Sequence, residues 1–384
     1  MRDELDGQPI ENETDQIENQ NKLAFDSKLR AGDGRDLIED FRTRSRADFS
    51  EGALAYKASV LAQAFKGRLP TASELKDVCE ELGAELATAL FLRTLMDSPH
   101  HGAFARDVRT FNFASWDPQV TRAAQVEVAI VASNLFQSGR QWGDHVDEWR
   151  LWARELGFTT EVIETDPRRS IASNARVIFE HLALSPSRRR IIVTYGQGSA
   201  EFRYLLHRRL HRDPNEPVPE EIEQIRGWIS VCGAFSGASS SRYFQENRVR
   251  RLLARLRMKV AGRNPIVLAE TSSLFPLWRR PLPDVSSLPL AIASIVAVPT
   301  RNQVPAAQQI IFSELAKAAP NDGVVSVTEA CAHPGLILAV PGMNHRAANP
   351  ILEPILKRTL AVVARSFGVG LEEPIKNPKT PSVQ

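Results

Sequence analysis

The sequence of 384 residues is long enough to bury a large core, and its composition is that of an ordinary globular protein. Hydrophobic residues make up 43% and charged residues 24%, and the net charge of +2 does not call for a nucleic acid or an anionic membrane as a partner. The three cysteines, Cys79, Cys232 and Cys331, lie far apart, without the spacing of a metal or redox site. We therefore expect buried thiols, no metal, no cofactor, and a reducing cytoplasm as the location.

The first 30 residues are polar and acidic, and they carry too little apolar surface to offset the entropy lost on ordering. We predict a disordered acidic tail over residues 1–30, with no signal peptide. No apolar run in the sequence is long enough to span a bilayer, so we expect no transmembrane segment.

Residues 31–120 form a predicted helical region that precedes the rest of the fold. Thr71 and Glu74 have the spacing of a capping box, and the apolar residues after them predict one amphipathic helix that ends near Ser98. His100 and His101 follow without a nearby acidic or cysteine partner, so we interpret them as a loop pair and not as metal ligands.

Residues 121–370 alternate between short apolar runs and amphipathic helical patterns, and residues 371–384 form a predicted C-terminal tail. The predicted strands cover residues 126–133, 159–165, 189–195, 226–234, 290–299 and 336–342. The predicted helices cover residues 145–157, 174–184, 200–211 and 350–367. This alternation predicts an α/β protein with a mostly parallel sheet that is covered by helices on both faces.

Residues 236–289 interrupt this alternation with an insertion that has no strand character. Its basic stretch, residues 247–262, is typical either of a solvated helix face or of a lid or docking surface. Its apolar, proline-rich segment, residues 272–285, includes Leu274 and Trp278. We predict that residues 274–278 pack over the carboxyl edge of the sheet and shield it from water.

The stretch TYGQGS, residues 194–199, joins the third predicted strand to its helix through two glycines. A dinucleotide-binding turn would need a third glycine where Glu201 stands, and a phosphate loop would need Gly-Lys-Ser/Thr. The stretch is instead similar to the nucleophile elbow, in which a strand ends in G-x-S-x-G and a helix begins.

From this elbow onward the sequence resembles the lipase and esterase branch of the α/β-hydrolases, over about residues 120 to 370. The matching stretches are TYGQG at 194–198, WISVCGAFSGAS at 228–239, PNDGVVSVTEA at 320–330 and PGMNHRAANP at 341–350. The resemblance implies an α/β-hydrolase fold, with Asp322 as the triad acid and His345 as the general base. It also places Gly196 at the position of the nucleophile.

Gly196 is the departure from this pattern, because glycine has no side-chain atom that could attack a carbonyl group. Ser199 is the nearest hydroxyl and could substitute, although bonding the backbone at the helix start is its simpler role. The loop after the first predicted strand, residues 133–144, lacks the His-Gly that often provides half of an oxyanion hole in this family. Backbone N–H groups of Gln197 and of the Leu135-Phe136 region could supply one instead.

Two classes of function stay open at this point. One is a non-catalytic or strongly divergent member that binds a small acyl-type ligand or a partner, with no role for nucleic acid. The other is an active hydrolase that uses Ser199 or a water activated by His345. A protein partner or a second copy could bind through the helices of residues 31–120 or through the insertion.

Overall fold

The computed structural model describes residues 51–133, 141–166, 168–184, 189–210, 218–260, 264–280, 282, 285, 288–346 and 350–369. The tails predicted at residues 1–30 and 371–384 lie outside these ranges. Among the described residues, no helix combines the length and the apolar character that crossing a membrane requires.

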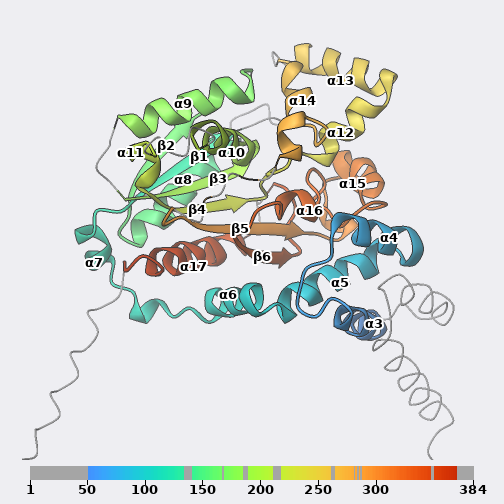
Figure 1. Ribbon diagram of the computed structural model, residues 1–384, viewed down its shortest axis with the longest axis horizontal. Coiled ribbons are helices and arrows are strands. Elements are labelled where there is room, and N and C mark those ends of the chain that lie inside the picture. The colour runs from blue at the N-terminus through green and yellow to red at the C-terminus, as the bar shows by residue number, and fades with distance from the viewer. Residues whose placement is uncertain are drawn as a thin grey trace, which may run out of the picture.

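Six parallel strands form one sheet at the centre of the molecule (Figure 1). The strands are β1 (Glu127–Ser133), β2 (Thr159–Glu164), β3 (Arg190–Gly196), β4 (Ile225–Val231), β5 (Ala291–Val298) and β6 (Leu336–Pro341). Their order across the sheet is β2-β1-β3-β4-β5-β6. The chain adds β2 on one side of β1 and β3 on the other, so the order of the strands reverses between β1 and β3. Ligand sites form at such a reversal in open α/β sheets.

Alternate residues along each strand pack against opposite layers of helices. Val128 and Ile130 belong to the core of one face, whereas Ala129 and Val131 belong to the core of the other. The first face is covered by α6 (Pro99–Thr110), α8 (Gln141–Glu155) and α17 (Leu352–Arg365), and the second by α9 (Ile171–Ala183) and α10 (Gln197–Leu210). This two-sided burial explains the continuous apolar runs and confirms the predicted parallel sheet with helices on both faces.

The N-terminal helices pack beside the β6 edge of the sheet and share a core with β5 and β6. They are α3 (Glu51–Gln63), α4 (Ala72–Leu82) and α5 (Ala84–Asp97) (Figure 1). The capping box of Thr71 and Glu74 is present at the start of α4. The single helix predicted up to Ser98 is wrong, because Gly83 adopts a φ of 95° and divides it into α4 and α5.

The sequence predicted a loop at His100 and His101, and this prediction is wrong. They lie in the first turn of α6, where Ser98 is the N-cap residue and Pro99 is in the first turn. Proline fits this position because its missing N–H would have no helical acceptor there.

The insertion forms helices without a strand among its described residues. They are α12 (Ser239–Glu246), α13 (Arg248–Val260), α14 (Ile266–Glu270) and the 3-10 turn η2 (Pro276–Arg279). Trp278 in η2 is buried against Ile171 and Ala200, which lie in the first turns of α9 and α10. Trp278 therefore lies at the carboxyl edge of the sheet, where those helices begin, whereas Leu274 of the same segment is exposed.

Shorter elements complete the described chain. They are α7 (Pro118–Ala123), α11 (Glu220–Glu223), α15 (Gln309–Leu315), α16 (Val327–Ala330), and the 3-10 turns η1 (Phe113–Ser115), η3 (Arg301–Gln303) and η4 (Ala306–Gln308). The strand order, the sharp turn after β3 and the long connections after β5 and β6 together make the α/β-hydrolase fold.

Candidate active site

Gly196 is the last residue of β3, and α10 begins at the next residue. Its φ of 51° lies in the left-handed region, which glycine adopts without steric cost. A Cβ atom at this position would lie 3.5 Å from Nε2 of His345, which is an ordinary van der Waals distance. There is therefore room for a side chain at the apex, and only the backbone conformation favours glycine.

Gly198 is required for a different reason, because α10 crosses close to β1 at this residue. A Cβ atom on Gly198 would lie 2.9 Å from the backbone oxygen of Val131 and 3.3 Å from its Cγ1 atom. The second glycine of the turn thus allows the helix to pack on the neighbouring strand.

Asp322 and His345 form a hydrogen-bonded pair beside the Gly196 turn. Nδ1 of His345 lies 2.7 Å from Oδ2 of Asp322, and the other carboxylate oxygen accepts the backbone N–H groups of Val324 and Val325 at 2.8 and 2.7 Å. The His345 side chain is 12% exposed and that of Asp322 is 4% exposed. Because a carboxylate can only accept, Nδ1 is the donor of this bond, and Nε2 is the ring nitrogen that faces Gly196.

The backbone of the histidine loop is fixed as well as its side chain. The N–H of His345 donates to the backbone oxygen of Asp322 at 3.1 Å, and the hydroxyl of Tyr195 donates to the backbone oxygen of His345. Burial raises the pKa of Tyr195 well above its ordinary value, so the phenol keeps the proton that it donates. The residue before the elbow therefore tethers the loop that carries the histidine.

Ser199 is fully buried, and its hydroxyl belongs to a network of polar side chains below the turn. Its Oγ lies 2.8 Å from the hydroxyl of Thr194 and 2.8 Å from that of Ser230. Thr194 in turn accepts the indole N–H of Trp228 at 2.9 Å. Thr194 stands where the G-x-S-x-G pattern has its first glycine, and this network gives its hydroxyl a structural role. The same network holds Ser199 inside the core.

Gln197 is the first residue of α10, so its backbone N–H has no acceptor within the helix. Its side-chain amide donates to the buried carboxylate of Glu201 at 2.8 Å, and Asn174 donates to the same oxygen at 2.7 Å. The side chain is thereby held away from the backbone donor. The other expected oxyanion donors, Leu135 and Phe136, lie outside the described residues.

Cys232 is a member of this site that the sequence did not indicate. The sequence placed it inside a strand, but β4 ends one residue earlier and Cys232 adopts a φ of 48°. The Sγ atom of Cys232, a carboxylate oxygen of Asp322 and a ring nitrogen of His345 lie within 4.8 Å of one another. The hydrogen bonds of Asp322 already occupy both of its oxygens and Nδ1 of His345, and burial raises the pKa of the thiol. This geometry fits a dyad with a neutral thiol beside it better than a metal site.

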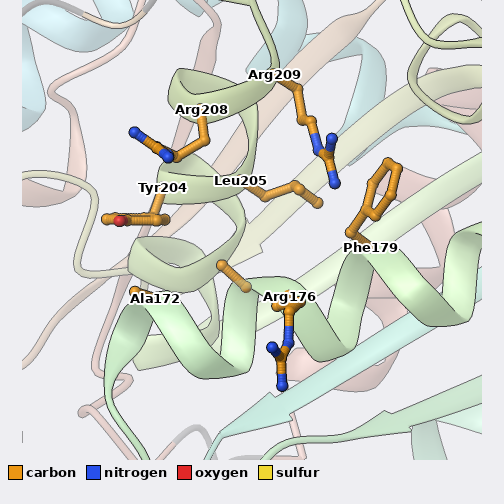
Figure 2. A pocket seen from close by; sticks show the side chains of 8 residues that line it. Ala172, Arg176, Phe179, Tyr204, Leu205, Arg208 and Arg209 are labelled. Carbon is orange, nitrogen blue, oxygen red and sulfur yellow. The ribbon is translucent and has the colours of Figure 1, made fainter.

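A separate groove of about 570 Å³ lies between α9 and α10, away from the dyad. Its lining includes Phe179, Tyr204 and three arginines, whose guanidinium groups point in different directions (Figure 2). Arg209 lies over the ring of Phe179, 3.4 Å from its centroid, and Arg176 pairs with Glu180 at 3.3 Å. The arginines therefore do not converge on a common anion.

No protein-family model and no curated protein matches the chain. Among solved structures, it is similar to a metagenomic carboxyl esterase, MGS0156, with 19% identity and a TM-score of 0.47 over 64% of this chain and 75% of that one. It is also similar to the mature lipase BlEst2 of Bacillus licheniformis, with 14% identity and a TM-score of 0.45 over 63% and 91% of the two chains. Phospholipase PlaB of Legionella pneumophila gives 12% identity and a TM-score of 0.43 over 65% and 61%. The fold itself follows from the strand order and from the sharp turn between β3 and α10.

Proposed function

We propose that the protein binds a small acyl-type ligand at the site formed by Gly196, His345 and Asp322, and that it does so without serine catalysis. The observation that carries this proposal is the glycine at the elbow beside a complete Asp-His pair. The pair supports binding and proton transfer, but a covalent acyl intermediate needs a nucleophile that glycine does not have.

The groups around the apex suit a carbonyl or carboxylate group. The backbone N–H at the start of α10 is a donor at the positive end of a helix dipole, which favours an oxygen anion. Protonation of Nε2 would make His345 a second donor beside the turn. A short acyl chain with its carboxylate or ester carbonyl between these two groups is the ligand class that we assign.

A second candidate function is hydrolysis by a water molecule that His345 activates. The specific observation that favours it is the orientation of the ring, with Nδ1 held by Asp322 and Nε2 facing the position of the absent serine. A water at that position could lose its proton to Nε2 while it attacks an ester carbonyl, and the protonated ring could return that proton to the alcohol oxygen as the ester C–O bond breaks. Catalysis through Ser199 finds no such support, because its hydroxyl is fully buried in the network with Thr194 and Ser230.

Titration of the native protein with hexanoate, followed by the backbone amide NMR signals around the Gly196 turn, tests the binding proposal. We expect saturable shifts that His345→Ala abolishes and Ser199→Ala preserves. Absence of saturable binding of both hexanoate and methyl hexanoate would refute the proposal. Turnover of methyl hexanoate that survives Ser199→Ala but not His345→Ala would instead establish the water route.

A further inference from the structure

Helix α13 carries its apolar residues on the side that faces solvent. Val249, Leu252, Leu253, Leu256 and Val260 are between 51% and 90% exposed, and they follow the spacing of one helix face. An amphipathic helix at the surface of a globular domain normally turns this face toward the core. In α13 the apolar face points to solvent instead.

The opposite side of α13 is the one that packs on the protein. Arg251, Ala254 and Met258 are the half-buried residues of this helix, and they recur at the spacing of the inward face. Figure 1 shows α13 at the outer margin of the molecule, beyond α12 and away from the sheet. The outward apolar face is therefore set by how the helix is anchored.

The charges of α13 are all of one sign. Its six ionisable residues are Arg248, Arg250, Arg251, Arg255, Arg257 and Lys259, and it contains no acidic residue. On a helix of 3.6 residues per turn, Arg248, Arg255 and Lys259 flank the apolar face on one side, and Arg250 and Arg257 flank it on the other. Arg250 also lies over the ring of Tyr243 in α12, 4.1 Å from its centroid.

We propose that α13 docks on the surface of an anionic lipid membrane, with its apolar face inserted among the acyl chains. An exposed apolar stripe between two rows of basic side chains is the arrangement that lies flat in a membrane interface. The flanking arginines and Lys259 can extend toward lipid phosphates while their alkyl chains cover the apolar face. Docking of two α13 helices from two copies would instead bring twelve positive charges together, because each helix carries six.

Co-sedimentation of the full chain with vesicles tests this proposal. We expect binding to vesicles of mixed phosphatidylglycerol and phosphatidylcholine, weak or no binding to phosphatidylcholine alone, and loss of binding at high salt. The double variant Leu252→Asp/Leu256→Asp should reduce vesicle partitioning by at least about tenfold. Replacement of Arg255, Arg257 and Lys259 by Gln should have a similar effect.

Because these side chains are exposed, the variants should keep the unfolding temperature of the native protein. Leu184→Asp is the matched control, since Leu184 is an exposed leucine at the end of α9. His345→Ala should bind vesicles normally, so failure of this proposal is separate from failure of the proposed function. No binding to anionic vesicles, or binding that both α13 variants leave unchanged, would overturn it. A change of oligomeric state in the α13 variants without vesicle binding would identify a second copy as the occupant.

Discussion

The Nε2 atom of His345 lies 3.5 Å from the point where a Cβ atom on Gly196 would be. A ring nitrogen of the Asp322–His345 pair thus faces the turn after β3, where Gly196 offers no side-chain atom. The hydrogen bond from Tyr195 and those that hold Asp322 fix this geometry. The consequences of this arrangement can be separated by substitution.

Ser199→Ala should destabilise the fold and leave any ester turnover unchanged. The variant removes a fully buried hydroxyl and leaves those of Thr194 and Ser230 each short of one partner, at a cost of about 1–3 kcal/mol. Urea unfolding measures the cost. Ser59→Ala is the control, because that hydroxyl bonds only locally, to the backbone oxygen of Tyr56, and should change stability by less than about 0.5 kcal/mol. Loss of turnover in Ser199→Ala without loss of stability would contradict a structural role.

Gly198→Ala should destabilise the protein by about 1–3 kcal/mol, because the new methyl group would press on the backbone of β1. Gly52→Ala is the matched control. Gly52 lies in α3 with open space around its Cβ position, so alanine should be neutral or stabilise by up to about 1 kcal/mol. Thermal unfolding of the two variants compares them. Equal behaviour would show that α10 does not pack on β1 as closely as described.

The His333 side chain should make the folded protein less stable in mild acid. Burial lowers its pKa from 6.5 to about 3, while the backbone N–H of Gly335 donates to Nδ1 and Nε2 bonds the hydroxyl of Ser294. The folded state therefore holds a neutral ring, whereas the unfolded chain takes up a proton below its ordinary pKa. The contribution of the neutral His333 ring to the free energy of unfolding is fully present above pH 6.5 and is lost as the pH falls toward 3.

Between pH 7 and pH 5 this one group should lower the free energy of unfolding by about 2 kcal/mol. Urea unfolding of the native protein and of His333→Gln at both pH values isolates the contribution, because glutamine does not titrate. The variant should lose less stability over this interval. Identical pH dependence in the two proteins would show that His333 does not stay neutral.

Trp278→Ala should loosen the insertion from the edge of the sheet. The indole packs on Ile171 and Ala200, and its N–H donates to the backbone oxygen of Glu270 at 2.8 Å. We expect a loss of about 3 kcal/mol and increased binding of a hydrophobic dye. Leu274→Ala is the control in the same segment, because Leu274 is exposed and should change neither quantity much. Unchanged dye binding in Trp278→Ala would show that the insertion does not cover apolar surface at the edge of the sheet.

The sequence predicted the sheet well because buried parallel strands leave a plain pattern of valine and isoleucine. It failed at Gly83, since an isolated glycine within a helical pattern does not reveal that its φ is positive. It also failed at Cys232. Strand β4 ends at Val231 because Cys232 adopts a φ of 48°, which the apolar pattern does not reveal.

For the candidate site, too, the sequence predicted some features and missed others. The order of Gly196, Asp322 and His345 was readable from the stretches around them, and the structure brings the three together. Burial of Ser199 was not readable, because the pattern does not reveal which face of the turn its hydroxyl occupies. Likewise, periodicity gave α13 an apolar face but not its outward direction, which the packing of Met258 and its neighbours determines.

We propose that the site has an Asp-His pair but no nucleophile, and labelling with a serine-reactive fluorophosphonate tests this proposal most directly. The native protein should remain unlabelled, because loss of the nucleophile typically removes about a millionfold in rate. Gly196→Ser should become labelled and show burst-phase hydrolysis of short p-nitrophenyl esters, at a cost of about 1–3 kcal/mol from the left-handed backbone. Adding His345→Ala should abolish both signals. Labelling of the native protein at Ser199, lost in Ser199→Ala, would contradict the account.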